Sequence, residues 1–394
     1  MKIVADENMS EVQTLFSAYG DVLTLAGSEI SRKVIRDASV LLVRSVTRVD
    51  QSLLEGSAVK FVGSATIGTD HIDLDYLRRA NIRFAHAPGC NANAVVQYMF
   101  SVFCTVEPQW RSKSIGIIGC GNVGGRLLRC LNSLGVHCKV YDPYLSASSV
   151  DVTIGKKTGA KNILTELDDV LQSDIVCLHA PLSHGGDFPT IHMINQQVLE
   201  DKLNGNGVLI NAARGGLIDN QALLAHLDSG ADLKVVLDVW ENEPNINLRL
   251  LQQVRLATPH IAGYSEEGRL KGSLMVRDAL GSWLGVDDSL PETPMEGAGE
   301  QSVFCLHPDE GVEKAILTSY RVAEDDRIMR SALLTDVNVK DDKDEKSNAA
   351  KTGPLFSGLR KHYLQRREFG SCRVELAADH VFRSPLKRMG FVVS

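Results

Sequence analysis

The chain has 394 residues, of which 44% are hydrophobic and 23% are charged, the balance of an ordinary globular protein of two or three domains. This composition excludes a disordered chain, a collagen and a coiled coil. The formal net charge of −7 disfavours a nucleic-acid scaffold, so an anionic ligand would have to meet a local cluster of Arg and Lys.

Neither a secretion signal nor a membrane span is predicted. The first residues read as a strand, and the most apolar helical stretch, Ala94–Cys104, is about half as long as a bilayer requires. The eight cysteines show no CxxC or metal-finger spacing. We therefore expect a reduced, cytoplasmic protein that binds no metal, membrane or nucleic acid.

Residues 1–92 alternate short apolar runs with amphipathic stretches, a pattern typical of a parallel sheet with right-handed crossovers. The pair Pro88-Gly89 ends this pattern, and a long helix is expected from about residue 93 to 106. The expected strands are Lys2–Ala5, Val40–Val43, Lys60–Gly63 and Ile82–Ala85, and the expected helices include Glu11–Tyr19 and Leu74–Ala80.

A second α/β block begins at Ser112. Six expected strands with helices between them over about 150 residues fit a doubly wound nucleotide-binding domain. A helical stretch follows from Ser265 to about Leu284. The expected strands are Ser114–Ile118, His137–Tyr141, Ile175–His179, Gly207–Asn211, Lys234–Val239 and Arg255–Ala257.

The last stretch of about 110 residues predicts a small third α/β domain. A linker is expected at Pro291–Glu300, and a solvated loop at the charged run Asp341–Lys351. The expected strands are Ser302–Leu306, Cys372–Leu376 and Phe391–Val393, and the expected helices are Gly311–Tyr320 and Leu355–Phe369.

A glycine-rich turn of the form GxGxxG follows the first strand of the second block. The first glycine allows a tight turn, the second lets a pyrophosphate approach the backbone, and the third lets the helix pack closely against the strand. The helix that follows offers its N-terminus to that pyrophosphate. Asp142 ends the next strand, about 20 residues further on, where an acid binds the adenosine ribose and favours NAD over NADP. The predicted cofactor residues of the turn are Gly119, Gly121, Asn122, Val123 and Gly124.

Three more strand ends carry an arginine, several acids and a histidine. These are Arg214, the acids Asp238, Glu241 and Glu243, and His260, and ligands of open α/β sheets bind at the carboxyl ends of strands. Oxidation of a hydroxy acid needs these three side-chain types. The Arg holds a carboxylate, the His takes the hydroxyl proton, and the Glu orients the imidazole.

The block from Lys113 to Gly268 resembles the D-isomer-specific 2-hydroxyacid dehydrogenases. This resemblance implies that Arg214, Glu243 and His260 are catalytic. It also implies that Asp238 lies near the nicotinamide, with the backbone at Ala180, Ala213 and Gly263 near the cofactor. The matching motifs are His179–Leu182, Asn211–Gly215, Asp238–Pro244 and Thr258–His260.

Within that family, the chain is most similar to the erythronate-4-phosphate dehydrogenases. The resemblance implies substrate contacts from Ser45, Thr66 and Tyr264. It also implies NAD-dependent oxidation of 4-phospho-D-erythronate in pyridoxal 5′-phosphate synthesis, and a homodimer joined through the C-terminal domain. The segments that carry it are Asp6–Met9, Val43–Thr47, Gly68–His71, Ala87–Asn91, His260–Tyr264 and Leu359–Glu368.

A phosphorylated hydroxy acid needs two separate cationic contacts. Arg214 suits the carboxylate, and Arg44 and Arg48 are candidates for the phosphate. A basic patch on the predicted helix 355–369 is a further candidate, in its own or a partner's site, and the alternative is a solvated helix face. The patch consists of Arg360, Lys361, Arg366 and Arg367.

The predicted architecture therefore has three parts. Residues 1–92 with 267–284 form a flavodoxin-like substrate-binding domain, residues 93–266 a Rossmann-type NAD-binding domain, and residues 285–394 a C-terminal α/β dimerisation domain. Two alternatives stay open. One is a dehydrogenase for 3-phosphoglycerate, glyoxylate or lactate, and the other is a non-catalytic protein that senses NAD.

Overall fold

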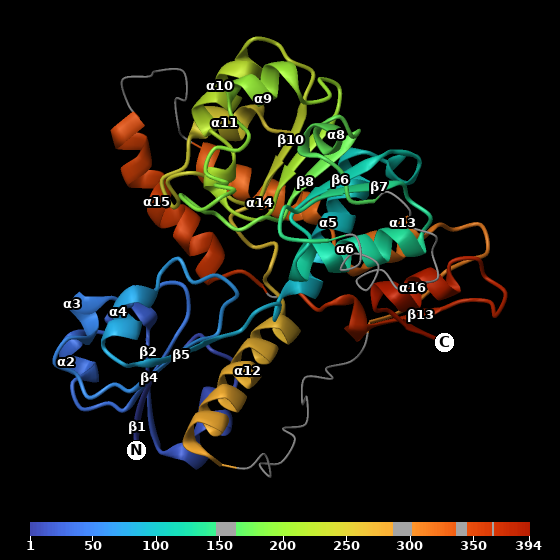
Figure 1. Ribbon diagram of the computed structural model, residues 1–394. Coiled ribbons are helices and arrows are strands. Elements are labelled where there is room, and N and C mark those ends of the chain that lie inside the picture. Colours follow the sequence, from blue (N-terminus) through green and yellow to red (C-terminus); the bar gives the residue numbers. More distant parts are fainter. Residues whose placement is uncertain (147–162, 287–301, 336–344, 365) are drawn as a thin grey trace. The chain divides into compact units, whose positions relative to one another are not determined.

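A computed structural model describes residues 1–146, 163–286, 302–335, 345–364 and 366–394 (Figure 1). The chain divides into two compact units. Unit 1 comprises Met1–Ala92 and Tyr264–Glu300, and unit 2 comprises Asn93–Gly263 and Gln301–Ser394. The chain therefore crosses between the units at residues 92/93 and 263/264, and a third boundary, at 300/301, lies outside the described residues. The expected linker 291–300 lies outside the described residues.

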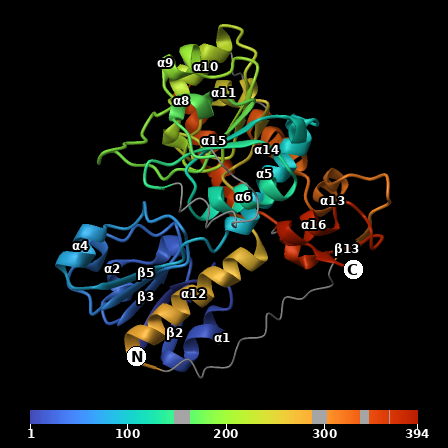
Figure 2. The ribbon, with the colours of Figure 1, turned by 45° about the vertical axis from the view of Figure 1, so that its right-hand side comes forward.

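Unit 1 contains a parallel sheet of five strands in the order β2-β1-β3-β4-β5, the flavodoxin-like arrangement (Figure 2). Four of the strands were predicted from their apolar runs. The edge strand β2 was not, because its residues are exposed or only half-buried and so lack a fully apolar run. The strands are β1 (Lys2–Asp6), β2 (Asp21–Leu25), β3 (Val40–Val43), β4 (Phe61–Ser64) and β5 (Arg83–His86).

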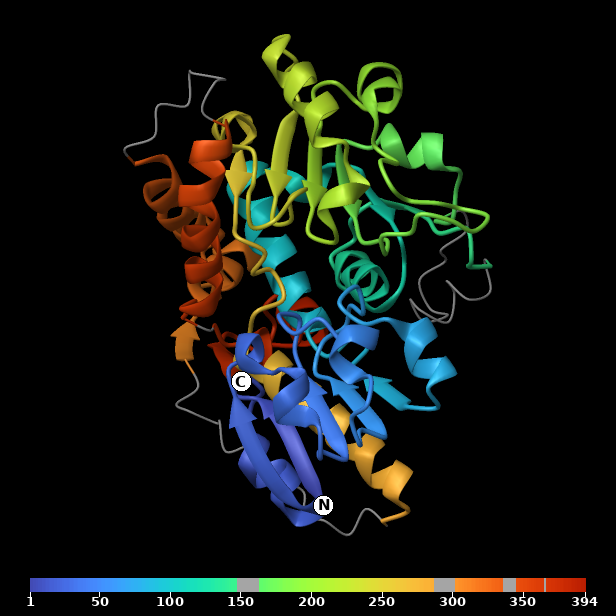
Figure 3. The ribbon, with the colours of Figure 1, turned by 90° about the vertical axis from the view of Figure 1, so that its left-hand side faces the viewer.

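Helices cover both faces of this sheet (Figure 3). The long helix α12 (Glu266–Leu284) begins at Ser265, whose hydroxyl accepts from the Gly268 N–H at 3.0 Å. Its Val276 and Leu280 are fully buried against the strands, on the same face as α1. The remaining helices are α1 (Val12–Phe16) on that face, and α2 (Arg32–Ile35), α3 (Gln51–Leu54) and α4 (Leu74–Arg79) on the other.

Unit 2 contains a parallel sheet of six strands in the order β11-β10-β9-β8-β6-β7. A single parallel bridge between Val140 and Leu164 adds a further position beside β7. The strand order reverses between β6 and β8, which is the switch point where nucleotides bind in this fold. The strands are β6 (Ile115–Ile118), β7 (Cys138–Tyr141), β8 (Ile175–Leu178), β9 (Val208–Asn211), β10 (Lys234–Leu237) and β11 (Leu256–Ala257).

Two buried clusters of apolar side chains flank the six-stranded sheet. The first packs α5 (Ala92–Val106) and α6 (Asn122–Ser133) on one face, and the second packs the shorter helices on the other (Figure 1). All six predicted strands are present in the described residues. The shorter helices are α8 (Leu167–Leu171), α9 (Gln196–Asp201), α10 (Asn220–Asp228) and α11 (Leu248–Gln253).

The C-terminal residues form a parallel sheet of three strands, in the order β12-β13-β14, and group with unit 2. Their apolar side chains share one buried cluster with α5 and α6. That they form a dimerisation domain of their own stays a prediction. The elements are β12 (Ser302–Cys305), α13 (Val312–Ser319), α14 (Val322–Leu334), α15 (Glu345–Lys361), β13 (Cys372–Glu375), α16 (Arg383–Met389) and β14 (Val392–Val393).

Two expectations for this part were wrong. The run Asp341–Lys351 is not a loop throughout, because α15 already begins at Glu345, while residues 341–344 lie outside the described part. The alanines and lysines of this run have high helix propensity, so the composition suits a solvated helix as well as a loop. The helix expected over Leu355–Phe369 ends at Lys361, because the chain beyond it leads Arg366 into the interior. No helix in the described ranges is both long and apolar enough to cross a bilayer.

Candidate active site

The three predicted catalytic residues follow three neighbouring strands that end in register. Leu237 pairs with Asn211 on one side and with Ala257 on the other, so β9, β10 and β11 stop at the same level. Adjacent strands lie about 4.8 Å apart. The loops that follow also approach closely, because a Cβ atom at Gly215 would clash with the Trp240 carbonyl. The strand register therefore brings the loops of Arg214, Glu243 and His260 to one edge of the sheet.

His260 and Glu243 form a direct pair. The Nδ1 atom of His260 lies 2.8 Å from Oε2 of Glu243, and the other carboxylate oxygen accepts from the Trp240 N–H at 2.8 Å. Burial raises the pKa of Glu243, but the charge and hydrogen bond of His260 outweigh it, so the pKa lies below its usual value. Glu243 is therefore a carboxylate that can only accept, and Nδ1 must carry the hydrogen. This leaves Nε2 of His260 as the nitrogen able to take a proton.

Asp238 holds the backbone that follows His260. Its carboxylate accepts from the N–H groups of Ile261 at 2.8 Å and Ala262 at 3.1 Å, and from the Thr258 hydroxyl at 2.7 Å. Burial raises the pKa of Asp238 although these bonds and His260 favour the ionised form. Only 1% of the residue is exposed, so it has little surface to offer a ligand. Contact between Asp238 and a nicotinamide stays a prediction.

Arg214 lies on a loop that Asn211 shapes. The buried Asn211 side chain donates to the Arg214 carbonyl at 2.8 Å and accepts from the Ala213 N–H at 3.1 Å. The guanidinium of Arg214 donates to the Ala213 carbonyl at 2.7 Å and is half-buried. A half-buried guanidinium beside the His260 loop is suited to bind a carboxylate.

The glycine-rich turn has the features that a pyrophosphate needs. Gly119 has a φ of 88°, and a Cβ atom there would meet the Ala180 backbone at 2.6 Å. A Cβ at Gly121 would meet nothing within 4 Å, so space is open where a ligand would approach. Asn122 and Val123 open α6, whose first N–H groups lack partners within the helix.

Asp142 is directed at this turn. One of its carboxylate oxygens accepts from the Cys120 N–H at 2.8 Å and the other from the Tyr144 N–H at 3.1 Å. A second feature at the switch point is His179, whose Nε2 is buried without a hydrogen-bond partner. Burial lowers the pKa of His179 to about 4, so the ring is neutral near pH 7. Space at Gly121, an acid beside the turn and an orphaned buried nitrogen together fit a bound dinucleotide.

Unit 1 contains a pair of arginines close to Asn8, which follows β1. Arg44, directly after β3, donates to the Asn8 carbonyl at 3.2 Å, and Arg269 of α12 donates to the same carbonyl at 2.6 Å. Burial and the charge of Arg44 lower the pKa of Arg269. The Tyr264 ring lies 5.9 Å from the Arg44 guanidinium. Two like charges that share one carbonyl oxygen make a site for an anion.

Sequence reasoning identified Arg44 and Tyr264 but missed Arg269. The available signal was its position on the helix predicted from Ser265, one turn beyond Tyr264. Arg48 is a poor candidate for a ligand, because its side chain is 82% exposed and pairs with Asp50 at 3.0 Å.

Ser45 and Thr66 end the two central strands of the same sheet. Ser45 is exposed, whereas the half-buried Thr66 hydroxyl donates to the Gly68 carbonyl at 2.8 Å and contacts the Ser64 hydroxyl at 2.7 Å. Ser64 in turn lies 3.0 Å from Nε2 of His71. Thr66 is therefore held in place by its neighbours, and its role as a substrate contact stays a prediction.

The predicted basic patch does not exist as one helix face. Arg366 lies beyond the end of α15 and is only 8% exposed, so the hypothesis that it binds a phosphate is wrong. Its guanidinium is committed to groups of its own chain. Arg360 remains on the helix, and its positive charge contributes to the lowered pKa of Glu243.

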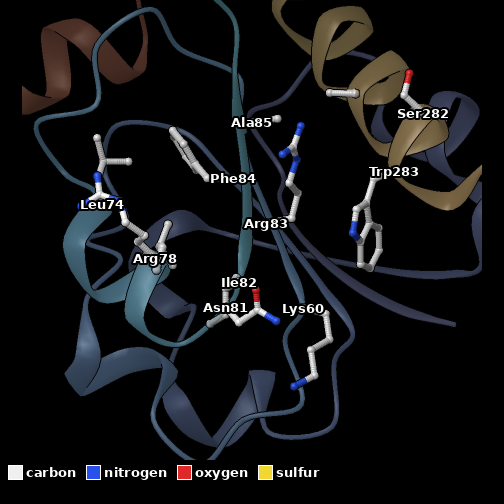
Figure 4. A pocket seen from close by; sticks show the side chains of 12 residues that line it. Lys60, Leu74, Arg78, Asn81, Ile82, Arg83, Phe84, Ala85, Ser282 and Trp283 are labelled. Carbon is white, nitrogen blue, oxygen red and sulfur yellow. The ribbon is translucent and has the colours of Figure 1, made fainter.

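A hollow of unit 1 lies elsewhere. Figure 4 shows Lys60, Arg83 and Trp283 around it, and its volume is about 1150 Å³. Lys60 precedes β4 and Ile82 precedes β5, so this hollow lies at the opposite ends of these strands from Thr66. Ligands of parallel α/β sheets bind at the carboxyl ends. We therefore place the candidate substrate contacts at Arg44 and Arg269 and not in this hollow.

Comparison with known proteins places the chain in a family. Residues 102–262 match the model of the D-isomer-specific 2-hydroxyacid dehydrogenase NAD-binding domain. An erythronate-4-phosphate dehydrogenase of Marinomonas sp. is 42% identical, with 96% of each chain covered. One from Hahella chejuensis is 40% identical over all of both chains. The chain belongs to the erythronate-4-phosphate dehydrogenase family. Like the rest of this family, it is an NAD-dependent dehydrogenase, and the predictions of family and cofactor are confirmed.

Solved structures support the fold. D-lactate dehydrogenase from Aquifex aeolicus, complexed with NAD and lactic acid, matches with a TM-score of 0.61 at 21% identity. NAD-bound 3-phosphoglycerate dehydrogenase of Entamoeba histolytica matches with a TM-score of 0.60 at 23% identity. Each match covers 72% of this chain and 95% of the other. The predicted fold class is confirmed, and part of the chain has no counterpart in these two structures.

Proposed function

We propose that this chain oxidises the C2 hydroxyl of 4-phospho-D-erythronate with NAD, in the synthesis of pyridoxal 5′-phosphate. Support comes from the names of relatives at 40–42% identity over nearly the full chain. The observation that carries the chemistry is the 2.8 Å pair of His260 and Glu243 at the ends of strands in register with the Arg214 loop.

In this proposal each residue has one role. Arg214 holds the substrate carboxylate through paired N–H donors. Nε2 of His260 takes the proton of the C2 hydroxyl while Nδ1 stays bonded to Glu243, which stabilises the charged ring. The hydrogen on C2 leaves as a hydride, and C2 and its oxygen form a carbonyl. Gly121, Asp142 and the N-terminus of α6 would hold NAD, which would supply the acceptor for this hydride.

The same proposal assigns the phosphate of the substrate to unit 1. The shared acceptor of Arg44 and Arg269 keeps two guanidiniums side by side, which suits a doubly charged group. Lactate and glyoxylate carry no phosphate that could bind these two guanidiniums. The arginine pair thus favours phosphorylated hydroxy acids over the smaller ones.

Formation of NADH from three hydroxy acids tests the function. The substrates are 4-phospho-D-erythronate, 3-phosphoglycerate and D-lactate, each assayed with a 2-oxo acid present to re-oxidise retained cofactor. A clear preference in kcat/KM for phosphoerythronate supports the proposal. Preference for another acid would retain the chemistry and change the substrate. Binding of NAD without turnover of any of them would favour the sensing protein.

Substitution of the arginines tests the phosphate site. We expect Arg269→Gln to raise KM for the phosphorylated substrate about 10- to 100-fold, the effect of one lost charge-assisted hydrogen bond. Arg44→Gln should behave alike. Arg78→Gln is the control, since Arg78 is 77% exposed and pairs only with Asp75. If KM in Arg269→Gln and in Arg44→Gln equals that of Arg78→Gln, the two arginines do not bind the substrate.

We also propose that the protein is a cytoplasmic homodimer joined through its C-terminal residues. Support comes from the family resemblance and from β12, an edge strand whose Val303 is 56% exposed. Sedimentation of the wild type against Val303→Glu is the test. A monomeric wild type would contradict the proposal.

A further inference from the structure

Arg366 is a buried arginine with a complete set of partners. Its Nε donates to the Gln97 side chain at 3.0 Å, and Nη1 donates to the Ile261 carbonyl at 3.1 Å and the Tyr363 hydroxyl at 3.4 Å. Nη2 donates to the carbonyls of Ala94, at 2.9 Å, and Ala262. These five bonds use every N–H of a guanidinium. No donor remains for a ligand, so the role of Arg366 lies in what it holds.

Two of these acceptors belong to the loop that follows His260. The carbonyls of Ile261 and Ala262 bond to Arg366, while the N–H groups of the same two residues bond to Asp238. The loop is therefore held between a buried cation on its carbonyl side and a buried carboxylate on its N–H side. Each ion attracts the end of the peptide dipole that faces it.

This arrangement explains the backbone of His260. Its φ is 57°, a left-handed conformation that is unfavourable for a non-glycine residue and persists only where the surroundings impose it. The His260 N–H donates to the Asp238 carbonyl at 2.7 Å, and the next two residues are fixed by the two ions. The direction of the imidazole thus depends on a side chain more than 100 positions further along the chain.

The third backbone acceptor of Arg366 lies close to another crossing of the chain between the units. Ala94 follows the first crossing at residues 92/93, and Ala262 precedes the second crossing at 263/264. One guanidinium therefore ties together the unit 2 ends of these two crossings. The Tyr320 ring covers it, with the guanidinium carbon 4.3 Å from the ring centre.

We infer that Arg366 is a positioning residue of the active site, through which the C-terminal residues fix the His260 loop and the two chain crossings at 92/93 and 263/264. This inference rests on the proposed role of His260. It gives the C-terminal part of the chain a task in catalysis within its own subunit.

Kinetics and amide hydrogen exchange of Arg366→Gln test the inference. We expect kcat to fall about 10- to 100-fold, because a base displaced by about 1 Å loses that much, while KM for NAD stays within about threefold. Arg366→Lys should recover part of kcat. The amides of Ile261 and Ala262 should exchange at least about tenfold faster in the Gln variant. Exchange is measured without substrate, so this outcome is independent of the proposed reaction.

Arg330→Gln is the matched control. Arg330 of α14 also donates to two carbonyls of unit 2, those of Leu251 at 2.6 Å and Val254 at 2.9 Å, and pairs with Asp326 at 2.8 Å. Its loss should lower stability to a similar degree but leave exchange at residues 261 and 262 unchanged. Equal effects of both variants on that exchange and on kcat would show that Arg366 is merely structural and would overturn the inference.

Tyr363→Phe keeps the test valid if Arg366→Gln does not fold. It removes one acceptor of Arg366 and the 2.9 Å hydrogen bond to Asp325, but no carbonyl contact. We expect about a two- to fivefold loss of kcat with KM for NAD unchanged. A variant that folds normally with unchanged kcat and unchanged exchange at Ile261 would contradict the inference.

Discussion

Unit 2 contains two imidazole–carboxylate pairs that look alike. His260 and Glu243 are joined at 2.8 Å, and His192 and Glu241 at 2.6 Å. Both histidines have a left-handed backbone, with φ of 57° and 49°. The difference lies in the second ring nitrogen. His192 Nδ1 faces Asp219 at 3.9 Å, so carboxylates flank both of its nitrogens, whereas the Nδ1 bond of His260 leaves Nε2 available.

The comparison shows that a short histidine–carboxylate distance does not by itself identify a base. The other oxygen of Glu241 accepts from the Asn220 N–H at 2.8 Å, so this carboxylate binds the first residue of α10. The backbone N–H of His192 also donates to the Gly216 carbonyl. The pair of His192 and Glu241 therefore stabilises the neighbouring loops, whereas the proposed reaction assigns the proton transfer to the pair of His260 and Glu243.

The largest expected effect separates the two histidines directly. His260→Ala should lower kcat about 10²- to 10⁴-fold, the usual contribution of a positioned base, whereas His192→Ala should change it less than about threefold. Steady-state formation of NADH measures both. Comparable losses of kcat in the two variants would show that the two histidines do not differ in function.

Substitution of the two glutamates should produce a smaller difference in kcat than substitution of the two histidines. Glu243→Gln should lower kcat about 10- to 1000-fold, since an amide no longer stabilises the charged imidazole and can favour the wrong tautomer. Glu241→Gln should lower the melting temperature but leave kcat within about threefold. A large loss of kcat in Glu241→Gln with an intact fold would assign the second pair to the reaction.

His179 extends the comparison to a histidine buried with Nε2 unpartnered. Its pKa of about 4 lies below the ordinary value of 6.5, so unfolding takes up a proton between these pH values. The free energy of unfolding should therefore fall as pH is lowered through that range, by at most about 1.4 kcal/mol per pH unit. Denaturant titrations at several pH values should show that the free energy of unfolding depends less on pH in His179→Phe than in the wild type. The exposed His184 supplies the control, and an equal slope in His179→Phe and wild type would contradict the low pKa.

Residues whose position follows from local sequence were the ones that could be predicted. Glycines in a turn and polar residues after buried strands are recognised from a few neighbours. Arg214, Glu243 and His260 were placed at adjacent strand ends in this way, and their catalytic roles stay predictions. Most strands were found for the same reason, since buried parallel strands read as apolar runs. The half-exposed edge strand β2 lacks such a run and was missed.

Residues whose role depends on distant contacts could not be predicted. Arg269 meets Asn8 from 261 positions away, and Arg366 meets Ala94 from 272 positions away. In the sequence, Arg366 is one cation among four in a short stretch, and nothing local distinguishes it from Lys361. Only the three-dimensional contacts show that one is buried and bonded while the other is exposed.

The division of unit 1 between two distant segments governs how it can be made. Its strands come from residues 1–92, yet Val276 and Leu280 of α12, both fully buried, complete the core on one face. A ribosome delivers those two side chains only after the whole six-stranded sheet has been synthesised. The nascent N-terminal sheet is therefore left with one face only partly covered, by α1, while some 170 further residues are synthesised, and chaperones can shield the exposed apolar surface in that interval.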